Sequence, residues 1–168
     1  MTAVGQVKRA VAAAIKAAGC AAIESYSEEQ LKRYATAVAA VGTKGTVIEE
    51  SGAAQYLGEK VDEATQETVS VYGRKMLLTL LIEVYAPRTL GAAGCEKAAE
   101  AVTQALMTAL PEGLKLGSLQ WGKTGWDKTT GMFRLDASAK YAAYFVAEAA
   151  DETVFTDFVL KGTVKERE

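Results

Sequence analysis

Two segments of the chain repeat apolar residues at the spacing of an α-helix. Residues 3–18 gather their apolar side chains on one face, and Gly19 follows as a natural stop, so we predict a helix there. Residues 92–110 repeat the pattern up to Pro111 and predict a second helix. The buried stripe of this second helix is expected to consist of Cys95, Ala98, Val102, Leu106 and Leu110.

Between the two helices the chain is rich in β-branched residues and predicts strands. Residues 35–50 are interrupted by glycines and are expected to form one or two strands. Residues 68–86 predict one long strand, or two strands bent at Gly73. Their run from Met76 to Ile82 is apolar on both faces, which places this segment in the centre of a sheet.

The last third of the chain predicts an antiparallel meander. Residues 114–149 are expected to form a long hairpin whose polar, glycine-rich tip is 122–131. From Phe133 onward apolar and polar residues alternate, as on a strand with one buried face and one wet face. A final strand is expected at 153–164. The order of elements predicts a single α+β domain, with an antiparallel-dominated sheet flanked by the two main helices.

Two connecting segments are polar. Residues 51–68 contain two glycines and show no clear period, so they predict a long loop. A loop of this length in a compact domain is uncommon unless it has a function. Residues 27–30 match a capping box with Ser27 as the cap, which indicates either a short turn of helix ending near Arg33 or a polar connector.

Composition argues against several kinds of site. The chain has 168 residues, a formal net charge of −2 and no histidine. This charge gives no long-range attraction to nucleic acid, and without histidine no Ser-His or Cys-His nucleophile pair can form within one chain. Cys20 and Cys95 are too few for a zinc site and are interpreted as reduced, buried residues. The apolar run 76–86 is too short to span a bilayer, so we expect a soluble protein without a cofactor or metal.

Residues 117–124, GSLQWGKT, match the pattern of a phosphate-binding loop. A working loop of this kind follows a strand and leads into a helix that starts at the Lys-Thr pair. Here residues 114–121 are themselves predicted to be a strand, and the next predicted element is another strand. We therefore interpret the match as one side of the hairpin and expect no catalytic residue, with a nucleotide-binding enzyme as a remote alternative.

The two tryptophans of this hairpin are expected to have different roles. Trp121 would alternate with Leu119 on the buried face and is predicted to join the core. Trp126 lies at the polar tip and has no obvious core to join. Because exposed aromatic residues are enriched at protein contacts, Trp126 is a candidate contact with a partner.

Three stretches together resemble a family of prophage tail proteins. They are YLGEKVDEATQETVSVYGRKMLLTLLIEVYAPRTLGAAGCEKA, LPEGLKLGSLQWGKTGWDKTTGMFRLDASAKYAAYFVAEA and FTDFVLKGTVK. Over about residues 34–165 the chain is similar to the tail terminators, also called tail completion or collar proteins, of contractile-tailed phages and phage-like particles. The resemblance lies in the overall pattern and includes no catalytic signature.

The resemblance implies a structural protein and not an enzyme. Tail terminators form a ring, commonly a hexamer, at the head-proximal end of the tail. There they stop the growth of tube and sheath and meet the head-tail connector, and DNA would pass through the ring without specific binding. The protein would occupy the host bacterial cytoplasm during assembly and the tail of the finished particle afterwards. Tyr56 and Leu57 in the 51–68 segment, together with Trp126, are the candidate interface residues.

Two further alternatives stay open from the sequence. Another neck or tail component, such as a head-tail connector, a head-closure protein or a tube subunit, would share a small α+β or β-rich fold and ring symmetry. A binding domain for a small ligand, with its site on the concave face of the central sheet, is the more distant possibility, and no motif supports it.

Overall fold

The computed structural model describes residues 3–50, 56–111 and 113–148. The three helices in these ranges are α1 (Ala3–Ala17), α2 (Glu28–Leu31) and α3 (Gly91–Thr108). The seven strands are β1 (Ala21–Ile23), β2 (Val38–Glu50), β3 (Tyr56–Val61), β4 (Thr68–Ala86), β5 (Lys115–Trp121), β6 (Gly125–Asp127) and β7 (Met132–Glu148). The α+β fold class is confirmed, and α1 and α3 match the two predicted helices to within two residues.

The strands form one mainly antiparallel sheet with the order β1-β2-β4-β7-β5. β4 and β7 lie at its centre and pair along almost their whole lengths, in agreement with the central place predicted for the apolar run of β4. β4 continues without a break through Gly73, and β2 is also one strand with a register shift between Thr43 and Gly45. The edge strand β1 is parallel to β2.

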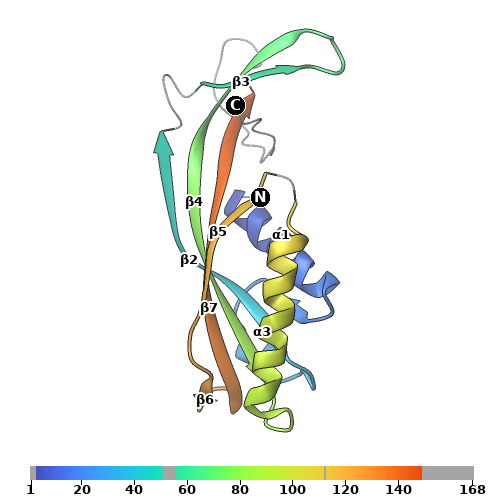
Figure 1. Ribbon diagram of the computed structural model, residues 1–168, viewed down its shortest axis with the longest axis vertical. Coiled ribbons are helices and arrows are strands. Elements are labelled where there is room, and N and C mark those ends of the chain that lie inside the picture. Colours follow the sequence, from blue (N-terminus) through green and yellow to red (C-terminus); the bar gives the residue numbers. More distant parts are fainter. Residues whose placement is uncertain (1–2, 51–55, 112, 149–168) are drawn as a thin grey trace.

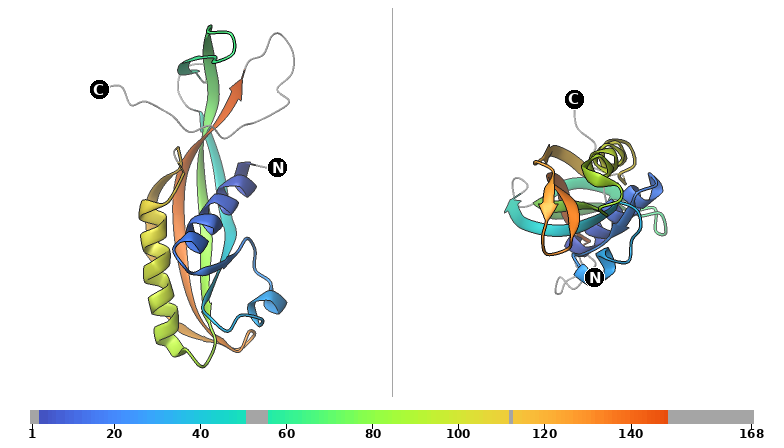
Figure 2. Two further views of the ribbon diagram at one scale, coloured as in Figure 1. Left: turned by 90° about the vertical axis from the view of Figure 1, so that its right-hand side faces the viewer. Right: turned by 90° about the horizontal axis from the view of Figure 1, so that it is seen from below.

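The two long helices cover one face of the sheet and build the main core against it (Figures 1 and 2). On α1, Val7, Val11 and Ile15 are fully buried, and burial of each such side chain stabilises the fold by about 1.5–3 kcal/mol. Four residues of the predicted α3 stripe are buried and Leu110 is partly buried against the same core. The predicted alternation along β7 is confirmed by its buried side chains: Leu135, Ala137, Ala139, Tyr141 and Ala143.

A smaller cluster covers the lower end of the opposite face of the sheet. It contains Ile23, Leu31, Val38, Ala40, Tyr85 and Met132. The Ser27 hydroxyl accepts a hydrogen bond from the backbone N–H of Gln30 at 3.4 Å, and Ser27 is the N-cap of α2, which begins at Glu28. Of the two interpretations of the capping box, the short helix is therefore correct, and it brings the fully buried Leu31 onto the sheet.

The long loop predicted at 51–68 is wrong for most of its length. Residues 56–61 form β3, which pairs with the first residues of β4, and residues 62–67 make the turn between the two strands. Residues 51–55 lie outside the described residues. The β3–β4 hairpin extends beyond the main core, so neither face of β3 has to be apolar. The sequence of β3 therefore shows no alternating pattern from which the strand could be predicted.

The predicted hairpin over 114–149 is present as β5 and β7, and its tip is more regular than expected. Within 122–131, β6 pairs with the first residues of β7, from Gly125 opposite Arg134 to Asp127 opposite Met132. The final strand predicted at 153–164 lies outside the described residues, so the C-terminal meander is described as far as β7.

Candidate functional site

The phosphate-loop match does not form a phosphate-binding loop. Gly117 to Trp121 lie inside the extended strand β5, and the Gly122 N–H donates a hydrogen bond to the Asp136 carbonyl at 2.7 Å. After Lys123 and Thr124 the next element is the strand β6. A phosphate loop needs the free N–H groups of a helix N-terminus at this point, so these residues do not form that kind of site.

Trp121 belongs to the fold, as its alternation with Leu119 predicted. Both side chains are partly buried against the main core. The Trp121 indole N–H donates to the Thr103 hydroxyl on α3 at 2.9 Å, and that hydroxyl donates to the Ala99 carbonyl at 2.8 Å. These bonds tie the edge strand β5 to α3 and satisfy the polar atom of the tryptophan.

The two cysteines are also part of the fold. Cys20 and Cys95 are both buried with free thiols, which agrees with the prediction. Burial raises the pKa of Cys95 to about 11, against a weaker opposing effect of a backbone hydrogen bond. A thiol with this pKa stays protonated near neutral pH, so Cys95 is not a nucleophile.

The remaining candidates lie at the two ends of an elongated molecule. In Figure 1 the β3–β4 hairpin forms the upper end, and β6 with the start of β7 forms the lower end. Tyr56 and Leu57 lie in β3 at the upper end, whereas Trp126 lies in β6 at the lower end. The fold therefore separates the residues that the sequence suggested for one interface into two surfaces.

The upper end exposes aromatic and aliphatic side chains. The ring of Tyr56 packs edge-on against the ring of Tyr72, with centroids 5.8 Å apart. Tyr56 is 45% exposed and Val61 is 57% exposed, whereas Leu57 is half-buried. Pairs of rings on a two-stranded ribbon hold each other in place, so the hairpin presents a fixed apolar patch.

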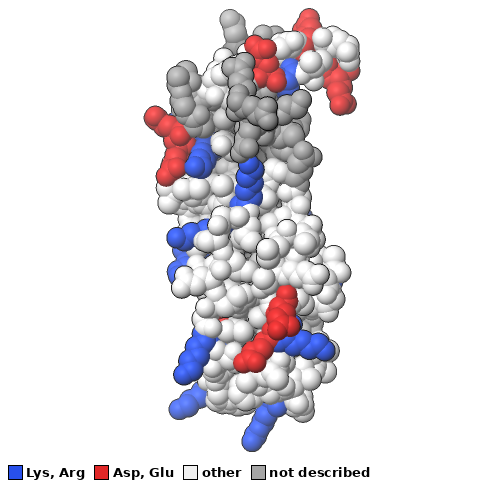
Figure 3. Space-filling model, in the orientation of Figure 1, with Lys and Arg blue, Asp and Glu red and all other residues white. Residues whose placement is uncertain are grey.

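The turn of this hairpin is ordered by its own hydrogen bonds and is strongly acidic. The Asp62 carboxylate accepts from the N–H groups of Ala64 and Thr65 at 2.8 and 3.2 Å, and the Asp62 N–H donates to the Glu67 carbonyl at 2.9 Å. The hairpin Tyr56–Tyr72 holds four acidic residues and one basic residue, a net charge of −3. Its acidic residues are Glu59, Asp62, Glu63 and Glu67. Figure 3 shows this concentration of acidic side chains at the upper end.

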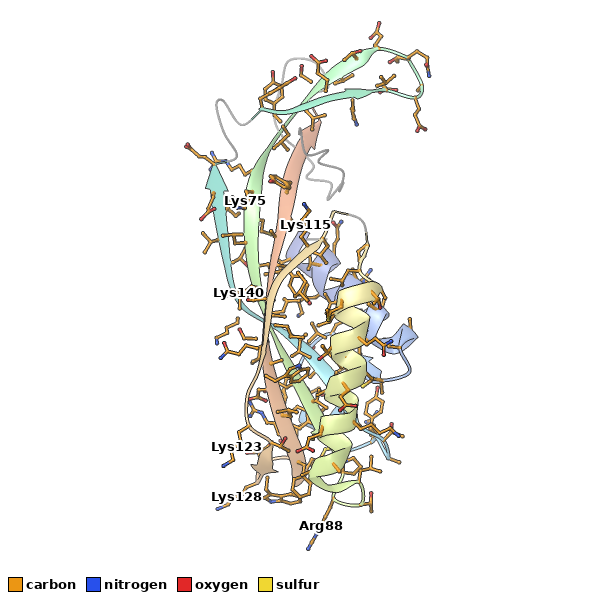
Figure 4. The ribbon with its side chains drawn as sticks, in the orientation of Figure 1. Lys75, Arg88, Lys115, Lys123, Lys128 and Lys140 are labelled. Carbon is orange, nitrogen blue, oxygen red and sulfur yellow. The ribbon has the colours of Figure 1, made fainter. Side chains whose placement is uncertain are left out.

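The lower end pairs an exposed tryptophan with basic side chains. Trp126 is 46% exposed and packs edge-on against Phe133 at 5.1 Å between centroids. Lys123 and Lys128 flank it along the chain, and Arg88 follows the end of β4 (Figure 4). Figure 4 places these three cations at the base of the molecule, and Figure 3 shows basic side chains there.

Asp127 is the acidic residue of the tip, and its carboxylate forms hydrogen bonds within the tip. Its carboxylate accepts from the Thr129 N–H at 3.1 Å and from the Thr130 hydroxyl at 2.8 Å. Burial alone would raise the pKa of Asp127, but these hydrogen bonds outweigh burial and hold the pKa below its usual value. The three cations and Asp127 together carry a net charge of +2.

A charged cluster supports the lower end from behind. Arg134 of β7 bonds the Asp136 carboxylate through two nitrogens at 2.6 and 2.8 Å and the Glu83 carboxylate at 2.7 Å. The Tyr85 hydroxyl donates to the same Glu83 at 3.3 Å. Burial raises the pKa of Glu83, and the attraction of Arg134 offsets part of that effect. Because the partners of Arg134 occupy its guanidinium, this cluster is a rigid support for the tip.

Comparisons with known proteins give no family assignment. No protein-family model matches this chain, and a search of curated proteins finds no match either. Within the ranges that the structure describes, no helix is long and apolar enough to cross a membrane. The same ranges contain no group of three His, Cys, Asp or Glu side chains placed to hold a metal ion.

Proposed function

We propose that this chain is a structural subunit of a phage-like tail, a tail terminator (tail completion or collar) protein that assembles with copies of itself into a ring. One observation of the structure carries the proposal. The elongated subunit exposes two different aromatic surfaces, one around Tyr56 and one around Trp126, at opposite ends. A closed ring is built from heterologous interfaces, in which two different surfaces of each subunit meet.

The resemblance to tail terminators supplies the rest of the proposal. The ring, commonly a hexamer in that family, would sit at the head-proximal end of the tail and contact the tube, the sheath and the head-tail connector. The formal net charge of −2 suits a channel through which DNA passes without specific binding. The protein would act in the host cytoplasm during assembly and remain in the particle.

The proposed role is structural and not enzymatic. The residues that resembled a phosphate loop belong to β5 and to the short connection between β5 and β6, and both thiols are buried. The exposed polar groups of the two ends are carboxylates and amines without a histidine to act as a base. The described residues line two cavities beside α3, but neither gathers a set of catalytic side chains.

Electron microscopy of tails made without this gene tests the proposal. Tubes that grow beyond their normal length would support a terminator, because nothing then stops polymerisation. Tails of normal length that lack heads would instead favour a connector or a head-closure protein. Normal particles in normal numbers would contradict any role in tail assembly.

A further inference from the structure

Both ends of the molecule combine an exposed aromatic patch with charge, and the two charges have opposite sign. The upper end carries Tyr56 and Tyr72 with a net charge of −3 over the hairpin Tyr56–Tyr72. The lower end carries Trp126 with a net charge of +2 over Arg88, Lys123, Asp127 and Lys128. An aromatic centre with a charged rim is the usual anatomy of a specific protein contact.

We infer that these two ends bind each other in neighbouring copies, so that the acidic β3–β4 hairpin of one subunit docks on the basic tip of the next. The inference rests on the proposed self-assembly and names its interface. Opposite charge selects the head-to-tail orientation, because two upper ends or two lower ends would repel each other.

The helix α3 adds to the positive potential of the lower end. Figure 1 shows that its N-terminus lies at the lower end of the molecule, and its first turn contains no acidic residue. The partial positive charge of a helix N-terminus therefore remains uncompensated on α3 itself. It acts in the same direction as Arg88, Lys123 and Lys128.

Both surfaces are preformed, which lowers the entropic cost of docking. The hairpin turn is fixed by the bonds to the Asp62 carboxylate, and the tip is fixed by those to the Asp127 carboxylate. Four other charged side chains lie outside these bonds. Glu63 and Glu67 at one end, and Lys123 and Lys128 at the other, are all exposed.

Charge-reversal variants test the pairing with the full chain. The hairpin variant carries E63K and E67K, the tip variant carries K123E and K128E, and the combined variant carries all four changes. Each two-site variant alone faces like charges across the proposed contact. Its self-association, measured by sedimentation at low ionic strength, should fall about tenfold or more relative to the natural chain.

Restoration is the decisive result. The combined variant has both signs exchanged and should self-associate again, and an equimolar mixture of the hairpin and tip variants should form mixed assemblies. A misfolded protein would not be rescued by two further substitutions, so rescue separates a lost contact from a lost fold. The matched control, K44E with K140E, reverses two exposed lysines at the middle of the sheet and should self-associate like the natural chain.

Three outcomes would overturn the inference: a natural chain that stays monomeric, two-site variants that self-associate normally, or a combined variant that is not restored. The proposed role as a tail terminator is tested separately, by the length of tails made without the gene. If the gene deletion lengthens tails while the charge variants assemble normally, the terminator role stands and this interface is wrong. If the deletion leaves particles unchanged, the proposed function is wrong whatever the variants do.

Discussion

At the scale of single residues, Tyr141 carries a buried hydroxyl in the main core. Its side chain is 1% exposed in the main core, and its hydroxyl has no hydrogen-bond partner among the residues described. An unsatisfied buried hydroxyl costs about 1–3 kcal/mol. We therefore predict that Tyr141→Phe raises the free energy of unfolding by about 1 kcal/mol, measured by urea denaturation.

Tyr85→Phe is the matched control for this prediction. The Tyr85 hydroxyl is also buried, but it donates to the Glu83 carboxylate at 3.3 Å. Removing it should lower the free energy of unfolding by about 1 kcal/mol. If both variants were destabilised alike, the Tyr141 hydroxyl would have to be satisfied in the folded protein.

Trp126 carries the second prediction at this scale. If it anchors the contact between subunits, Trp126→Ala should weaken self-association by about 2 kcal/mol, roughly thirtyfold. The free energy of unfolding should fall by no more than about 1.5 kcal/mol, the value of an edge-on pair with Phe133. Met107→Ala is the control, because Met107 is 73% exposed on α3 and lies outside both ends. Equal effects of the two variants on association would contradict the role of Trp126.

The sequence could predict the environment of each tryptophan but not where the candidates lie relative to one another. The alternation with Leu119 was enough to assign Trp121 to the core, since strand geometry is local. The separation of Tyr56 from Trp126 depends on the register of β4 against β3 and β7, which pairs residues distant along the chain. A single-sequence pattern carries no such information.

At the scale of elements, the sequence predicted those that face the main core but not the strands at the two ends of the molecule. The core imposes a helical period on α1 and α3 and an alternating period on β7, and the sequence shows both. β3 and β6 lie at the two ends with few buried side chains, so no period marks them. β1 has three residues, too few to show a period.

The independence of the β3–β4 hairpin from the core gives a prediction for this element. Replacing Glu59–Ser70 by Asn-Gly joins Gly58 to Val71, which face each other in the ladder, through a turn suited to two strands. Among the described residues, the buried core contains none from this segment, so the free energy of unfolding should change by less than about 1 kcal/mol. Self-association and tail assembly should both be lost.

Circular dichroism and thermal unfolding check the first part of this prediction, and sedimentation and electron microscopy check the second. A variant that folds and assembles normally would exclude the hairpin from the contact. A variant that unfolds would show that the hairpin stabilises the sheet, against its position in the structure.

At the scale of the whole molecule, the distribution of charge matters more than its sum. A net charge of −2 suggested from the sequence only a weak overall field. The fold places the acidic hairpin at one end of the long axis and Arg88, Lys123 and Lys128 at the other. The subunit is therefore electrically polar along its length, a property that needs the three-dimensional arrangement and that composition cannot reveal.

This polarity predicts how self-association depends on salt. The screening length falls from about 10 Å at 0.1 M to about 3 Å at 1 M ionic strength, so attraction between the exposed ends weakens as salt is added. Raising sodium chloride from about 0.1 M to 1 M should reduce the association constant about tenfold, because rim charges steer and orient the partners. The aromatic contacts should persist at high salt, since burial of apolar surface does not depend on screening.

The combined charge-reversed variant makes the salt experiment specific. Exchanging both signs leaves the attraction in place, so its association constant should fall with salt along the same slope as that of the natural chain. The two-site variants start from repulsion, and added salt should strengthen their self-association. Sedimentation across the salt series measures all four proteins. One common slope for the four would mean that the charges at the two ends do not meet.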